Sequence, residues 1–121
     1  MVLQNRILRD AICMLIESDP DLRIAAATDS YENVPELFVH HGADFLVIDA
    51  AEPEDADLEA IRGLRAADPG CRIIGLAPDE WNYGVAEARN AGVTDILPMD
   101  AIGDRLLPLI HSAQPALVDS R

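Results

Sequence analysis

The chain has 121 residues and a formal net charge of −13, from 22 acidic residues against 9 basic ones. This length suits one domain with one core, and half of the residues are apolar. The basic residues form no cluster, which argues against direct binding to nucleic acid or to an anionic membrane. There is no apolar run long enough for a transmembrane helix and no signal-peptide pattern, so we expect a cytoplasmic protein. Cys13 and Cys71 are far apart in apolar settings, and we expect two buried free thiols.

Helical and strand patterns alternate along the chain. Asn5 can cap the first helix, and Gly42 and Gly92 follow later helices as glycine C-caps. Pro108 is expected either to kink the last helix or to sit in its first turn. In chain order, the sequence predicts a helix from Asn5 to residue 18, a strand over 22–27, a helix over 31–41, a strand over 44–49, a helix over 57–67, a strand over 71–77, a helix over 80–91, a strand over 95–97 and a helix over 103–113.

This alternation predicts a doubly wound parallel sheet with helices on both faces, in three α/β/α layers. A strand before the first helix would have only Met1, Val2 and Leu3 to build it, so we expect it to be truncated or missing. A neighbouring segment or another chain would then fill the gap. Residues 116–118 (Ala-Leu-Val) are apolar enough to do so, and an unstructured tail is the other interpretation.

Asp49 ends the apolar run Phe45-Leu46-Val47-Ile48, which is typical of a fully buried strand. Ligands and chemistry collect at the carboxyl edge of open parallel sheets, so Asp49 is a candidate to accept a phosphoryl group or to bind a metal. The competing interpretation is that Asp49 is an acid left at a strand end with neither of these functions. The acidic run from Glu52 to Glu59 lacks the glycine and spacing of a calcium loop, and His40 and His41 suit a helix C-terminus better than a metal site.

The order and spacing of these residues resemble the receiver domain of two-component response regulators, a CheY-like and flavodoxin-like fold. The most similar members are those with a LuxR/NarL-type output domain. The resemblance rests on Arg6-Ile7-Leu8-Arg9-Asp10-Ala11, Glu17-Ser18-Asp19-Pro20-Asp21-Leu22, Leu46-Val47-Ile48-Asp49 with Pro53, and the run from Ala88 to Asp95. It implies a receiver domain over 1–113 and a linker over 114–121 toward an output domain, with Asp49 as the phosphoacceptor candidate.

The family's other site residues do not match. Leu3 and Gln4 stand where the family has two acids that hold Mg²⁺, Ala77 stands in place of its Ser/Thr, and Met99 in place of its lysine. Asp49 offers one carboxylate, with Glu52 as a possible second ligand. Phosphoryl transfer depends on positioning and charge neutralisation. The resemblance therefore implies that the phosphoacceptor is present but that the metal ligands, the hydroxyl and the lysine that assist the transfer are missing.

We accordingly expect a non-enzymatic signalling domain, degenerate in phosphorylation and without a cofactor. It would work by forming a homodimer or by binding a regulatory protein, and so control a transcriptional output. Trp81 and Tyr83 are candidates for a partner surface, and ordinary packing is the alternative for both. Two rivals stay open: a conventional Mg²⁺-dependent receiver phosphorylated on Asp49 by a histidine kinase, and a stand-alone flavodoxin-like ligand binder, although no Gly-rich phosphate loop follows any predicted strand.

Overall fold

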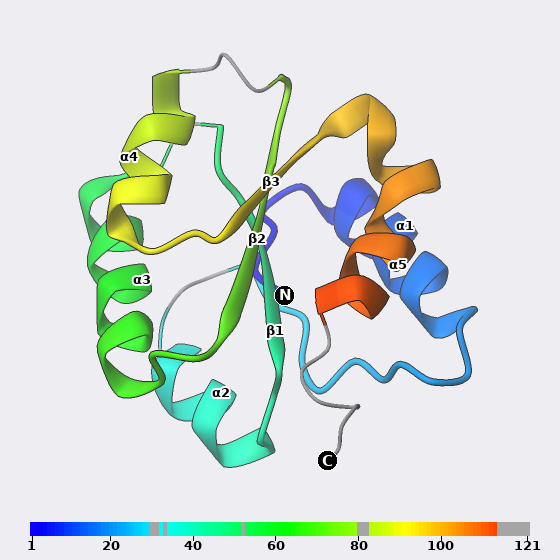
Figure 1. Cartoon of the computed structure of the whole chain (residues 1–121), viewed down its shortest axis with the longest axis horizontal. Helices are drawn as coiled ribbons and strands as arrows, with labels where there is room; N and C mark the ends of the chain where they lie inside the picture. Colours follow the sequence, from blue (N-terminus) through cyan, green and yellow to red (C-terminus); the bar gives the residue numbers. More distant parts are fainter. Residues whose placement is uncertain (30–31, 33, 52, 80–82, 114–121) are drawn as a thin grey trace.

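A three-layer arrangement is visible in Figure 1, with the sheet between two groups of helices. The structure is a computed structural model that describes residues 1–29, 32, 34–51, 53–79 and 83–113. Helices α1 (Arg6–Glu17) and α5 (Ile102–Ala113) lie on one face of the sheet. The other face is covered by α2 (Val34–His41), α3 (Asp55–Ala67) and α4 (Tyr83–Ala91). No described helix is both long and apolar enough to cross a membrane.

The sheet contains three regular strands, β1 (Phe45–Asp49), β2 (Arg72–Ala77) and β3 (Asp95–Pro98). They are parallel in the order β1-β2-β3, with Asp49 level with Leu76 and Ala77 level with Pro98. A short 3-10 helix over Met99–Ala101 joins β3 to α5. All strands therefore end at the same edge, where Asp49 was expected to lie.

The first three residues act as a truncated first strand. Val2 forms parallel bridges with both Thr28 and Ile48. Its N–H donates to the Val47 carbonyl at 2.8 Å, and Leu3 N–H donates to the Thr28 carbonyl at 3.0 Å. The segment thus takes the central place between Thr28 and β1. The predicted flavodoxin-like fold, with a truncated first strand, is confirmed.

The strand predicted over residues 22–27 is wrong. These residues have no regular strand structure, and the segment pairs with the sheet by a bridge at Thr28 alone. The reason is that a strand needs a neighbour along its length, and the truncated first strand reaches only Thr28. The other predicted elements exist, with ends shifted by a few residues. The predicted start of the 31–41 helix and of the 80–91 helix includes positions outside the described residues.

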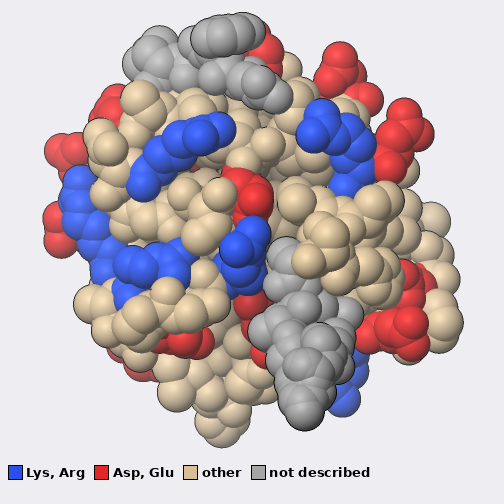
Figure 2. Space-filling model, viewed as in Figure 1, with Lys and Arg blue, Asp and Glu red and all other residues tan. Residues whose placement is uncertain are grey.

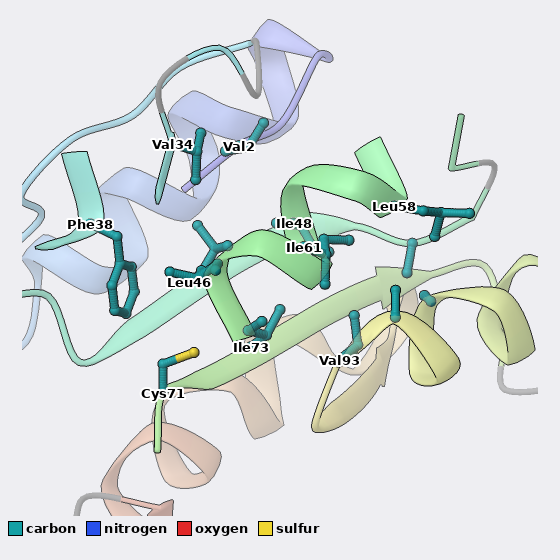
Figure 3. Close-up of a cluster of buried hydrophobic side chains, with 14 residues drawn as sticks. Val2, Val34, Phe38, Leu46, Ile48, Leu58, Ile61, Cys71, Ile73 and Val93 are labelled. Carbon is teal, nitrogen blue, oxygen red and sulfur yellow. The ribbon is translucent and has the colours of Figure 1, made fainter. Parts of the chain in front are cut away.

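The core has two parts because successive strand residues point to opposite faces of the sheet. Leu46, Ile48 and Ile73 pack toward α2, α3 and α4, a cluster shown in Figure 3. Val47 and Ile74 pack toward α1 and α5 with Leu3.

The expected N-cap of α1 and the glycine after α2 are present in the structure. Asn5 Oδ1 accepts the Leu8 N–H at 3.0 Å, and Gly42 has a φ of 63° after α2. Pro108 lies inside α5, so it is not in the first turn.

Both cysteines are free, as expected, but only Cys71 is buried. Cys13 on α1 is half-buried, with its Sγ 3.9 Å from the Met1 sulfur. Burial raises the pKa of both thiols above the ordinary value.

Candidate functional site

Asp49 is the last residue of β1 and its side chain is exposed at the carboxyl edge of the sheet. Its Oδ1 accepts the Ala51 N–H at 2.9 Å, so the carboxylate orders the loop that follows the strand. The next residue anchors this loop, since Ala50 N–H donates to the Leu76 carbonyl of β2 at 2.8 Å. A carboxylate is therefore presented to solvent from a firmly held backbone.

The two positions expected to hold Mg²⁺ carry no carboxylate. Leu3 is only 1% exposed and packs in the core beneath α1 and α5. Gln4 is exposed. The carbonyl of Leu3 accepts a hydrogen bond from Arg9 Nη1 at 2.8 Å, so a guanidinium lies at the end of the first strand. Hard divalent cations prefer carboxylate oxygens, and a leucine side chain with a neighbouring guanidinium offers the opposite chemistry.

The residues that follow the other two strands are apolar. Ala77 is fully buried at the end of β2, and Met99 begins the short helix after β3 and is half-buried. All nine basic residues of the sequence are arginines, so no lysine is available to stand in for the missing one at position 99. A phosphoryl group on Asp49 would thus find neither a hydroxyl at 77 nor an ammonium at 99.

The described residues contain no group of three or more His, Cys, Asp or Glu side chains that could hold a metal ion. Glu52, the possible second ligand, lies outside the described residues. The acids Glu54 and Asp57 instead cap the N-terminus of α3, where the Asp57 carboxylate accepts the Glu54 N–H at 3.0 Å. His40 and His41 end α2 with their rings edge to face, 5.2 Å between centroids.

The start of α4 closes over the loop that follows Asp49. A Cβ on Gly84 would overlap the Ala51 carbonyl oxygen and lie 3.0 Å from Pro53 Cδ. Sequence reasoning missed Gly84. The available signal was a glycine in the first turn of a helix, where it costs helical stability and so indicates a close contact. Trp81 lies outside the described residues, and Tyr83 is placed only as the first residue of α4.

On the face of the molecule drawn in Figure 2, the arginines lie in separate groups with tan and red surface between them. Two arginines lie at the opposite edge of the sheet, where the strands begin. Arg72 pairs with Asp95 at 2.7 Å, and Arg65 donates to three backbone carbonyls. These arginines hold the fold together and do not form an anion site.

No protein-family model matches the chain, and no curated protein sequence does either. Solved structures do. The response regulator domain of Thermotoga maritima CheB aligns over 98% of this chain and 97% of its own, with a TM-score of 0.76 and 20% identity. The REC domain of AraT, a response regulator from Geobacillus stearothermophilus, aligns over 93% and 90%, with a TM-score of 0.72 and 26% identity.

A LuxR-family DNA-binding response regulator from Staphylococcus aureus aligns over 93% of each chain, with a TM-score of 0.76 and 19% identity. The chain has the fold of a response-regulator receiver domain. The short sheet, with three regular strands and a truncated first strand, fits that fold. At these identities the likeness concerns the fold, and function rests on the site itself.

Proposed function

We propose that the chain is a receiver domain of a two-component-type response regulator that signals without phosphorylation. Residues 1–113 form the domain, and residues 114–121 act as a linker toward an output domain that controls transcription. The domain acts in the cytoplasm through contacts with a second copy or with a regulatory protein, and it is not an enzyme. The observation that carries this proposal is the burial of Leu3 at a position where a conventional receiver needs an acid.

The chemistry of phosphoryl transfer supports this proposal. Catalysis there is almost entirely positioning and neutralisation of charge on the phosphoryl oxygens. Asp49 is accessible, but Leu3, Ala77 and Met99 supply no metal ligand, no hydroxyl and no cation. A phosphoryl group would therefore be transferred slowly, and no polar side chain at position 77 would respond to it. A signal must instead be carried by binding.

Helix α1 offers a surface for such binding. Ile7 is 82% exposed and Met14 is 72% exposed, and they lie two turns apart on the same side of the helix. Two copies of α1 packed antiparallel about a two-fold axis would bring Ile7 of one copy against Met14 of the other. A two-fold dimer is the commonest assembly of soluble proteins, so this face is our candidate homodimer contact. Tyr83, the first residue of α4, and Trp81, which precedes it in the sequence, are candidates for a second partner face.

Sedimentation equilibrium tests this contact. The variant with Ile7→Asp and Met14→Asp should be a monomer at concentrations where the unchanged chain is a dimer, because charges would be buried without partners. Val39→Asp is the control, since Val39 is 61% exposed on α2 and outside the proposed contact. A monomeric unchanged chain, or a dimer that survives both α1 substitutions, would refute the α1 dimer.

The alternative function is a Mg²⁺-dependent receiver that a histidine kinase phosphorylates on Asp49. The exposed carboxylate at the carboxyl edge of β1 is the observation in its favour. Incubation with acetyl phosphate and Mg²⁺, followed by intact-mass measurement, distinguishes the two functions. We expect no stable addition of a phosphoryl group. Addition that is lost in Asp49→Asn would favour the alternative and contradict our proposal.

A further inference from the structure

Strand β3 forms one edge of the sheet, and a groove lies along this edge between two helices. β3 pairs with β2 on one side, and no described strand lies on its other side. Helices α4 and α5 lie on either side of β3 (Figure 1). The groove has a volume of about 290 Å³, close to the lower end of the range for ligand sites. It is lined by Arg89 of α4, by residues 94–97, and by Arg105 and Leu109 of α5.

Ile96 presents its backbone N–H and C=O to this groove. In β2, the Leu76 carbonyl bonds to the loop after β1. Backbone groups alternate sides along a strand, so the N–H and C=O of Gly75 face β3 instead. Gly75 is level with Ile96, and in a parallel pair it bonds to the residues that flank its partner, Asp95 and Leu97. The Ile96 N–H and C=O therefore point away from β2, and no described residue bonds to them.

Two arginines without a counter-charge line the groove. Arg89 and Arg105 are exposed, and within the described part of the chain neither forms an ion pair. No acid lies three or four residues from either of them along its helix, whereas Arg62 of α3 has an ion pair of that spacing. The acid in the groove, Asp95, is already paired with Arg72 at 2.7 Å. The groove is therefore positively charged in a chain whose net charge is −13.

We propose that this groove binds an acidic segment of a partner protein, which adds to β3 as a short antiparallel strand. In an antiparallel pair, one residue of the segment exchanges both hydrogen bonds with Ile96. Pro98 has no N–H to continue the pairing, so the added strand is short. Unpaired strand edges accept strands in this way, with affinity from backbone bonds and specificity from side chains. The proposal goes beyond the proposed function, since it requires neither the α1 dimer nor Asp49.

The two arginines determine the spacing of the acids in the segment. Arg89 lies in the last turn of α4, near the start of β3, and Arg105 lies in α5, near the end of β3. Ile96 points toward the α4 side of the sheet and Leu97 toward the α5 side. Successive residues of an extended segment also point to opposite sides. An acid opposite Leu97 would face Arg105, and a second acid three residues later would lie opposite Thr94 and face Arg89.

Apolar side chains line the groove between the two arginines. Ile96 and Leu109 are both only partly buried. The residue after the first acid of the segment would lie opposite Ile96, and the next would lie on the side of Leu109. A segment with an acid, an apolar residue, any residue and a second acid therefore fits the groove.

NMR with the synthetic peptide acetyl-Thr-Glu-Val-Thr-Glu-Thr-amide tests the proposal on the full 121-residue chain. The peptide should bind saturably and shift the Ile96 amide and the guanidinium resonances of Arg89 and Arg105. At saturation, the Ile96 amide should exchange with solvent at least about tenfold more slowly, the factor that corresponds to one typical hydrogen bond. The Leu97 amide faces β2, so it should be protected with and without peptide and reports that the fold is unchanged.

Two matched peptides test the backbone pairing and the spacing. Replacing Val with Pro keeps both carboxylates but removes the N–H that would bond to the Ile96 carbonyl. The isomer acetyl-Thr-Glu-Val-Glu-Thr-Thr-amide places both acids on the same side of the strand. Both peptides should bind at least about threefold more weakly, because each loses one hydrogen bond or one ion pair.

Substitutions in the chain test the charge contacts. Arg89→Gln and Arg105→Gln should each weaken binding of the first peptide about two- to fivefold, as expected for exposed ion pairs. Arg62→Gln is the control, since Arg62 is exposed on α3 and does not line the groove, and it should leave the affinity unchanged.

Three results would overturn the proposal. One is the absence of saturable binding, and another is equal affinity for all three peptides or equal affinity in both arginine variants and the unchanged chain. The third is protection of the Ile96 amide that is present without peptide and grows with protein concentration, because it would indicate that a second copy of the chain occupies the edge.

Discussion

Gly84 of α4 lies against the Ala51 carbonyl, two residues after Asp49, with no room for a Cβ between them. Replacing Gly84 with alanine should therefore lower the free energy of unfolding by about 1–3 kcal/mol, as overpacking does elsewhere. Urea denaturation measures this change. The control is Gly63→Ala in α3, where a Cβ meets nothing within 4 Å, and which should raise stability by about 0.5–1 kcal/mol. Equal effects of the two substitutions would show that the close contact with Ala51 is unimportant.

Arg65 donates hydrogen bonds to three carbonyls in two loops at the edge where the strands begin. Its guanidinium donates to the Pro69 and Cys71 carbonyls at 2.8 Å and to the Gly92 carbonyl at 2.7 Å. Arg65→Met should lower the free energy of unfolding by about 1.5–3 kcal/mol, because hydrogen bonds to charged groups are strong and the carbonyls lose their donors. Arg65→Lys keeps the charge but loses the planar fork, so it should restore only part of the stability in urea denaturation.

Aspartate substitutions at the buried Leu3 and at the exposed Gln4 should differ strongly in their effect on stability. Leu3→Asp should lower the free energy of unfolding by about 3–5 kcal/mol, because it places an unpaired charge in the core beneath α1 and α5. Gln4→Asp, on the neighbouring exposed residue, should change stability by no more than about 0.5 kcal/mol. Thermal unfolding of both variants checks this. A fully stable Leu3→Asp chain would mean that the position is not part of the core.

His111 of α5 and Asp19 after α1 form a contact of 2.6 Å between Nε2 and Oδ2. The hydrogen bond from His111, helped by one from the Asp21 N–H, holds the pKa of the Asp19 carboxyl below its usual value. A depressed carboxyl pKa stabilises the fold above the unfolded-state pKa, and this contribution is lost as the pH falls through the folded-state pKa.

His111→Ala should raise the Asp19 pKa toward its ordinary value in a carbon-13 titration of the carboxyl group. Asp21→Asn keeps its backbone N–H and is the control. An unchanged Asp19 pKa in His111→Ala would contradict the assigned cause.

Periodicity and turn residues were enough to predict the layers of this fold, because the helices are amphipathic and the strands Phe45–Asp49 and Arg72–Ala77 are uncharged apart from Asp49 and Arg72 at their ends. The strand over residues 22–27 was mispredicted because its pairing depends on a neighbour that is too short, which local pattern does not reveal. The burial of Leu3 and the contact of Gly84 with Ala51 were not predicted from the sequence either, since both depend on segments that meet only in the folded structure. Asp49 was predicted from its place at the end of an apolar strand, and Leu3, Gln4, Ala77 and Met99 were matched to site positions by resemblance; their chemical roles stay predictions.

The central claim is that this receiver fold carries an acid at Asp49 but no working phosphorylation site. The most direct measurement is an NMR titration of the amide resonances with Mg²⁺ and beryllofluoride, a mimic of the phosphoryl group, alongside Asp49→Asn. We expect no saturable shifts at Asp49, Ala77 or the residues of α4, and no difference between the two chains. Saturable shifts at these residues that disappear in Asp49→Asn would contradict the account.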